Sequence, residues 1–154
     1  SNSTFPSKKT SHREDNLNKE ILRLRAQRNG IDLAERRLRL AIQDMLENGD
    51  KVDQWLKGSN TTQELNKFPN EVSFNAVLSA LAKNAKRDPM ASVKAEQLLQ
   101  EMDNLADRFP HLRPTIFSYN AVLEAYAKNC HAGNSKRSQQ SKLAILRIFR
   151  KVQR

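Results

Sequence analysis

Apolar side chains recur with the spacing of an α-helix along most of this chain. In five segments they stand at i, i+3, i+4 and i+7, which places four side chains on one face of a helix. No alternating strand pattern competes with these stripes, so the sequence predicts an all-α fold. The stripes are Leu38, Ala41, Ile42 and Met45; Phe74, Val77, Leu78 and Leu81; Ala95, Leu98, Leu99 and Met102; Tyr119, Val122, Leu123 and Tyr126; and Ile145, Ile148, Phe149 and Val152.

Two stretches of the sequence are near copies of one another. Residues 71–85 and 116–130 are identical at nine of fifteen positions, and Phe74 is matched by Tyr119. Alanines stand between the apolar residues of both copies, which permits close approach of neighbouring helices, and a second amphipathic helix follows each copy. Duplicated helix-turn-helix units bury their apolar faces by stacking on one another. We therefore predict an α-solenoid of about six helices in two to three repeats.

Helix-breaking residues set the expected boundaries in the first part of the chain. Asn29-Gly30 ends a first helix over about 15–29. Asp32 can then cap a second helix over about 32–47. Both helices lie close together in sequence, as expected for one repeat unit.

Residues 48–68 lack a clean apolar stripe, and we interpret them as an insertion with a short helix around Val52–Lys57. Trp55 within it is expected to pack back on the repeats, with stacking on a nucleic-acid base as the alternative. A second polar stretch, between residues 129 and 141, is expected to be a loop before the last helix.

The chain is expected to form one repeat domain over residues 15–154, preceded by a disordered basic arm at 1–14. Within the domain, we predict a diverged repeat at 15–47, followed after the insertion by repeats at 71–115 and 116–154. The arm is rich in Ser, Lys and Arg. A remnant of an organelle transit peptide, which has a similar composition, is the alternative interpretation of this segment.

The charge of the chain narrows the kinds of partner that it could bind. The 154 residues contain 27 Lys and Arg against 17 Asp and Glu, a formal net charge of +10. Such a surplus favours polyanions, nucleic acid first and anionic membranes second. Eight of the basic residues lie between Lys128 and Arg154, where we expect mainly a solvated outer face. No apolar run is long enough to span a membrane, so no membrane insertion is expected.

Residues suited to catalysis or metal binding are sparse. His12, His111 and His131 have no metal-ligand spacing with carboxylates or with Cys130, the only cysteine. No glycine-rich phosphate loop is present. The sequence therefore predicts a protein that is not an enzyme and that uses no metal or cofactor.

The residues that open the two near copies are similar to those of pentatricopeptide repeat proteins. Pro-Asn-Glu-Val-Ser-Phe-Asn at 69–75 and Pro-Thr-Ile-Phe-Ser-Tyr-Asn at 114–120 resemble that family's repeat junction, and the following Ala-Val-Leu and Ala-Lys-Asn also fit. The resemblance is clear over 69–129 and looser elsewhere, because the loops are longer than in the family. It implies a right-handed solenoid that binds single-stranded RNA, about one base per repeat. It further implies a non-catalytic adaptor in organelle RNA processing, stability, editing or translation, located in mitochondria or plastids.

The resemblance also implies which residues read the bases. The fifth residue of each repeat would meet the base edge, and here it is Asn75 and Asn120. The last residue of a repeat would assist, which gives Thr115 for the repeat at 71–115 and Asn70 for the unit before it. An amide suits this role because it both donates and accepts hydrogen bonds. The alternative is structural, with these asparagines bonding backbone groups at a helix start.

Two further pairs of residues complete the implied site. The second residue of each repeat, Val72 and Phe117, would stack between bases, and the thirteenth, Lys83 and Lys128, would bind the backbone phosphates. Val72 and Phe117 could instead be packing residues. The lysines lie near helix C-termini, where they would stabilise the helix dipole in any case.

The main alternative function is a protein–protein interaction scaffold of the tetratricopeptide type, which shares the stacked helical hairpins. That family favours Trp-x-x-Leu-Gly-x-x-Tyr in its first helix, a pattern absent from the repeat helices here. Protein partners therefore remain a second expectation beside RNA. A third class, an enzyme whose catalytic domain would follow Arg154, is also open.

Overall fold

The computed structural model describes residues 16–58, 66–130 and 135–153, and every regular element in these ranges is helical. Seven α-helices lie in this part of the chain, together with one short 3₁₀ helix, Pro110–Leu112. The predicted all-α fold is therefore confirmed. The predicted arm at 1–14 lies outside the described residues. The α-helices are α1 (Leu17–Arg25), α2 (Gly30–Glu47), α3 (Gly49–Lys57), α5 (Glu71–Asn84), α6 (Met90–Ala106), α7 (Ile116–Asn129) and α8 (Ser135–Val152).

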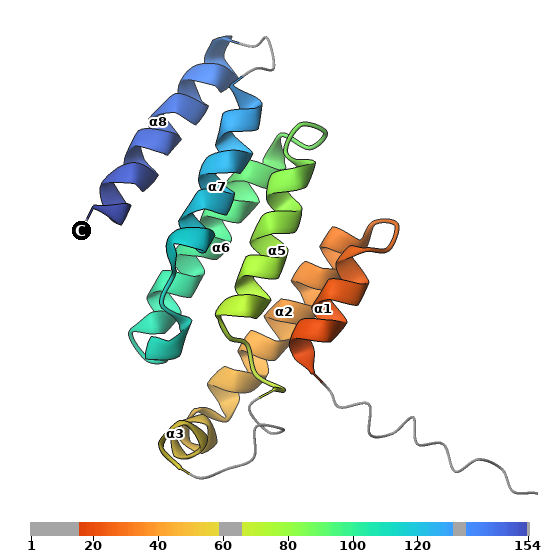
Figure 1. The fold of residues 1–154 in the computed structure, drawn as a ribbon, viewed down its shortest axis with the longest axis vertical. Helices are drawn as coiled ribbons and strands as arrows, with labels where there is room; N and C mark the ends of the chain where they lie inside the picture. Colours follow the sequence, from red (N-terminus) through yellow and green to blue (C-terminus); the bar gives the residue numbers. More distant parts are fainter. Residues whose placement is uncertain (1–15, 59–65, 131–134, 154) are drawn as a thin grey trace, which may run out of the picture.

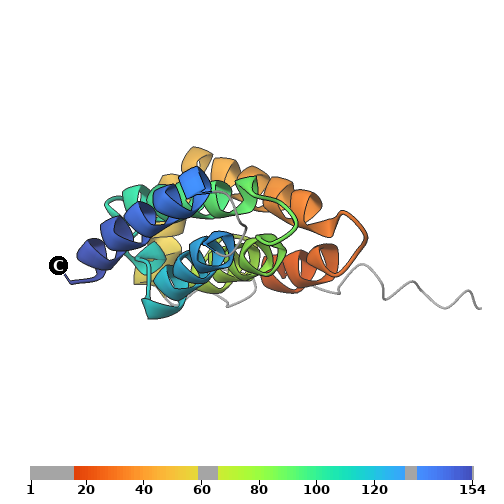
Figure 2. The same ribbon diagram turned by 90° about the horizontal axis from the view of Figure 1, so that it is seen from above.

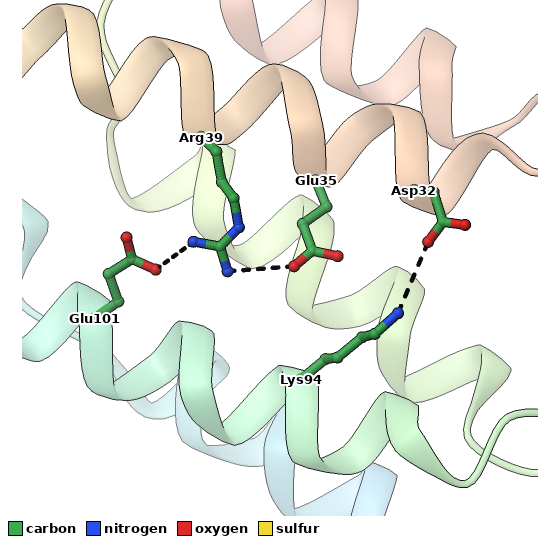
Figure 3. Close-up of polar contacts among 5 residues, drawn as sticks. All are labelled: Asp32, Glu35, Arg39, Lys94 and Glu101. Atoms are coloured by element: carbon green, nitrogen blue, oxygen red, sulfur yellow. Dashed lines mark hydrogen bonds and ion pairs between the residues drawn. The ribbon is translucent and has the colours of Figure 1, made fainter.

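The helices are arranged in two rows (Figures 1 and 2). The first-row helices are α1, α5 and α7, and α5 packs against both of the others. The second-row helices are α2, α6 and α8, each of which packs against the first-row helix that precedes it in sequence. Second-row neighbours touch mainly through long side chains, as Figure 3 shows for α2 and α6. Seen end-on in Figure 2, the rows form two layers.

One core fills the space between the rows. The predicted stripes supply much of it, and Phe74, Leu38 and Met102 have no exposed surface. The same cluster of buried residues extends from Leu17 in α1 to Ile148 in α8. Helices α2, α5, α6 and α7 thus contribute the apolar faces that the sequence pattern predicted. Helix α8 differs, because it buries Ala144 and Ile148 and leaves Phe149 of its predicted stripe 51% exposed.

The α1–α2 turn departs from the predicted boundaries. Helix α1 ends at Arg25, and Asn29 takes a left-handed conformation with φ of 57°. Helix α2 already begins at Gly30, because the turn brings that residue against the end of α1: a Cβ there would lie 1.9 Å from the Leu24 carbonyl oxygen. The first helix therefore ends earlier than the predicted residue 29, and Asp32 lies inside the first turn of α2 rather than at its cap. The reason is that glycine, which has no Cβ, allows the backbone at residue 30 to approach the end of α1 closely.

The insertion and the last loop also differ from the expected outlines. The short helix in the insertion is α3, whose Trp55 is partly buried and packs on Phe68 with ring centroids 5.0 Å apart. Helix α8 begins at Ser135, so the loop predicted to reach residue 141 is shorter. Lys, Arg and Gln are good helix formers, and the Ser138 hydroxyl donates to the Cys130 carbonyl, which extends α8 beyond its apolar stripe.

Candidate functional site

The start of each first-row helix carries an asparagine directly after its first hydrophobic residue that packs in or against the core. Asn75 follows Phe74, and Asn120 follows Tyr119, as the repeat predicted. The structure adds a third member, Asn18, which follows the fully buried Leu17 of α1. The sequence signal for Asn18 was weak because the residues around it share almost no identity with the two copies.

Asn75 lies in a hydrogen-bond network between α5 and α7. The Ser118 hydroxyl donates to Asn75 Oδ1 at 2.7 Å, and Asn75 Nδ2 donates to Glu71 Oε1 at 3.2 Å. The Thr115 hydroxyl donates to the same Glu71 oxygen at 2.8 Å. Asn75 and Thr115 therefore both bind Glu71, in contacts that join two helices.

Asn70 occupies the equivalent network between α1 and α5. Its Oδ1 accepts from the Ser73 backbone N–H at 3.2 Å and from Asn18 Nδ2 at 3.1 Å. The Ser73 hydroxyl donates to Asn18 Oδ1 and accepts from the Asn70 backbone N–H. Asn70 thus caps α5, which satisfies N–H groups that the helix itself leaves unpaired.

Asn120 differs from its counterparts. It is exposed, and its amide has no hydrogen-bond partner within residues 16–58, 66–130 and 135–153. Phe117, one turn earlier, has 69% of its surface exposed, and the equivalent Val72 of α5 has 53% exposed. An exposed aromatic ring beside an open amide is a surface on which a base can stack and be read.

The two lysines also differ in their surroundings. Lys128 Nζ donates to the Ala82 carbonyl at 2.9 Å and pairs with Glu124 at 3.0 Å, so it links α7 to α5. Lys83 is exposed and has no partner among the described residues. The same position therefore holds one engaged cation and one that is available to an anion.

Lys83 lines an open hollow of about 800 Å³ at the C-terminal end of α5. Four cationic side chains line this basic hollow, and no carboxylate does. Arg25 is held in place there, because it donates to the Ala76 carbonyl at 2.9 Å and to the Ser79 hydroxyl at 2.8 Å. Sequence reasoning missed these neighbours; the adjacent Lys86-Arg87 pair was a signal, whereas Arg25 comes from a distant part of the chain. The lining residues are Leu22, Arg25, Ala26, Ile31, Ala80, Lys83, Asn84, Lys86 and Arg87.

The described residues offer few groups for other chemistry. They contain no group of three or more His, Cys, Asp and Glu side chains that could hold a metal ion. His111 is partly buried, and its imidazole Nε2 lies 3.2 Å from the Pro69 carbonyl oxygen. Burial lowers the pKa of His111 below its ordinary value of 6.5. Within the described ranges, no helix is both long and apolar enough to cross a membrane.

Comparison of the chain with protein-family models, with curated proteins and with solved structures finds no match.

Proposed function

We propose that this chain is a non-catalytic, single-stranded RNA-binding protein, built as a right-handed α-solenoid of helix-turn-helix repeats. The observation that carries the proposal is the pairing of exposed stacking residues with available cations on the first-row helices. Phe117 and Val72 are exposed at the N-terminal ends of α7 and α5, and the basic hollow lies at the C-terminal end of α5. A role in RNA processing, stability, editing or translation in mitochondria or plastids completes the proposal and rests on the family resemblance alone.

The register of α5 supports one continuous binding edge. Val72, Asn75 and Lys83 stand three and eleven residues apart, close to one and three helical turns, so they share a face. Stacking on exposed side chains and neutralisation of phosphates are the two terms that dominate single-strand binding. A net charge of +10 adds long-range attraction for the polyanion.

The test is fluorescence anisotropy with short single-stranded RNA at several salt concentrations. Lys83→Ala should lower the slope of log K against log salt by roughly 0.7, because one phosphate of the strand is then no longer neutralised. Lys128→Ala is the matched control at the equivalent position: its ammonium is already engaged by Ala82 and Glu124, so the slope should stay close to that of the wild type.

Phe117→Ala tests the stacking half of the proposal. It should weaken binding by about 1–3 kcal/mol, the usual contribution of one stacked base, with the salt slope unchanged. Asn120→Ala should alter base preference more than salt slope. If each of the three variants, Lys83→Ala, Phe117→Ala and Asn120→Ala, binds RNA as the wild type does, RNA is attracted by net charge only.

A protein scaffold is the second candidate, and one observation favours it. Helix α8 exposes Leu143, Leu146 and Phe149, each with more than half of its surface accessible. Exposed apolar side chains that share one helix are typical of protein contact surfaces. If the RNA experiment gives only charge-driven binding, this candidate becomes the leading one.

A further inference from the structure

The contacts between second-row helices repeat with their charges exchanged. Between α2 and α6, the Arg39 guanidinium donates to Glu101 at 2.8 Å (Figure 3). Between α6 and α8, the Arg147 guanidinium donates to both oxygens of Glu96 at 2.7 and 2.8 Å. In each case a residue of one helix pairs with a residue of opposite sign on the next second-row helix.

The two pairs occupy the same register. Arg39 directly follows Leu38 and Glu96 directly follows Ala95, the first buried residue of each stripe. Their partners, Glu101 and Arg147, directly precede the last buried residue of the next stripe, Met102 and Ile148. The position is therefore fixed by the fold, whereas the sign of its charge is free to change provided that the partner changes with it.

The first-row helices repeat a second contact of this kind. The Ser73 hydroxyl of α5 donates to Asn18 of α1, and the Ser118 hydroxyl of α7 donates to Asn75 of α5. Both serines are fully buried. Each unit thus has one asparagine on its first-row helix and one charged residue on its second-row helix. The next unit binds the asparagine through a serine hydroxyl and the charged residue through a side chain of opposite charge.

Helices α7 and α8 have residues at the same two positions, but neither residue has a bonding partner among the residues that the structure describes. Asn120 is the equivalent of Asn75, and Lys142, which directly follows the buried Ser141, is the equivalent of Glu96. Both are exposed. We call the surface formed by Asn120, Leu123, Ala127, Lys142 and Leu146 the open face.

The apolar residues that α7 contributes to the open face are exposed or partly buried, whereas the equivalent residues of α5 are buried. Ala82 of α5 has no exposed area, but its equivalent in α7, Ala127, is exposed. Leu78 is fully buried, whereas its equivalent Leu123 is only partly buried. Leu146 has 55% of its surface exposed at the position where Gln100 of α6 binds Lys151 of α8.

We propose that the open face binds a helical hairpin of the same register, with a serine hydroxyl facing Asn120 and a carboxylate facing Lys142. The docked hairpin would take Asn120 out of the RNA-binding edge, as Ser118 does for Asn75, and would leave Phe117 exposed for stacking, as Val72 is at the equivalent position.

The carboxylate follows from the charge rule, because Lys142 is basic where Glu96 is acidic. A second copy of this chain fits less well. Its α2 would bring a carboxylate, Asp44, which directly precedes the buried Met45, but its α1 has Asn16 at the position of the serines, so no hydroxyl would meet Asn120.

The test joins a duplicate of residues 114–154 after Arg154 and varies one charge on each side. The duplicated copy of Arg147 is kept or changed to Glu, and Lys142 is kept or changed by Lys142→Glu. Chains with opposite charges at the two positions should unfold at a Tm about 2 °C higher than chains with like charges. Lys51→Glu, an equal charge change on the exposed surface of α3, is the control. Its effect on the Tm should be the same whether the duplicated copy of Arg147 is kept or changed to Glu.

The asparagine supplies an independent readout. Asn120→Ala should leave the Tm of the 154-residue chain unchanged and lower that of the extended chain, because only there does the amide meet a serine. A Tm that ignores both the charge combination and Asn120→Ala would overturn the proposal. So would concentration-dependent self-association of the original chain that Lys142→Glu abolishes, since the occupant would then be a second copy.

Discussion

At the scale of single residues, the serines at the helix starts must each accept one hydrogen bond and donate another while fully buried. Ser118 is fully buried, accepts from the Thr115 backbone N–H at 3.1 Å and donates to Asn75. A hydroxyl is suited to this position because it is both a donor and an acceptor within a small volume. The sequence carried a signal for the caps, since Asn or Thr three residues before Ser at the start of an apolar run resembles a capping box.

His111 allows a residue-scale prediction about pH. Because the Pro69 carbonyl oxygen can only accept, Nε2 must carry the proton, and the buried Nδ1 has no partner within the described ranges. Protonation of Nδ1 would place an unpaired N–H in the interior, and burial lowers the pKa of His111 accordingly. The unfolded chain therefore binds more protons below the ordinary value of 6.5.

The free energy of unfolding should consequently rise as the pH increases through the region below 6.5 and level off above that value. Urea denaturation at constant ionic strength between pH about 5 and 7.5 measures this trend. His111→Gln, whose amide can still donate to Pro69, should flatten the profile. A profile of the same steepness in this variant would assign the effect to other groups.

At the scale of elements, small residues decide how closely the first-row helices approach. Ala82 lies at the α5–α7 contact, where its carbonyl accepts from Lys128 and its side chain has no exposed area. The equivalent Ala127 stands at the end of its row and is exposed. The two alanines have the same local sequence, Ala-Lys-Asn, and differ only in whether a further helix covers them.

Enlarging these two alanines should therefore have unequal effects. Ala82→Leu should destabilise the chain by about 1–3 kcal/mol, because the added atoms overpack the α5–α7 contact. Ala127→Leu should change stability by less than about 0.5 kcal/mol. Chemical denaturation of both variants checks the prediction, and equal losses would mean that helix propensity rather than packing controls this position.

At the scale of the whole molecule, one core connects the two rows. The cluster of buried residues includes Phe68, on which Trp55 packs, so even α3 is tied to the same core. Long side chains on the second-row helices bridge from one unit to the next at the surface. Such exposed pairs contribute little each, so cooperativity should come from the shared core.

We expect the whole chain to unfold in one transition. Trp55 is the only tryptophan, so its fluorescence reports on α3 and Phe68, whereas far-UV circular dichroism reports on all helices. The urea midpoints from the two signals should coincide because the core is continuous. An earlier midpoint for the tryptophan signal would show that α3 unfolds as a separate unit.

The buried faces of α2, α5, α6 and α7 could be predicted from the sequence because apolar periodicity depends only on the order of residues along the chain. The face of α8 could not, since Phe149 of its predicted stripe is exposed. The bounds of the α1–α2 turn could not, because α2 begins at Gly30 through a close approach to the Leu24 carbonyl that no pattern of apolar residues shows. The basic hollow could be predicted only in part, since Lys83 stood in the repeat while Arg25 reaches it from another helix.

The sequence by itself determined that Asn75 and Asn120, and likewise Lys83 and Lys128, occupy equivalent positions on first-row helices. Only the tertiary structure decided that their roles differ. Asn75 meets Ser118 and Asn120 stays open, whereas Lys128 is held by Ala82 and Lys83 is free to meet an anion. The physical reason is that each of these contacts is completed by a group from the neighbouring unit, whose presence no local pattern encodes.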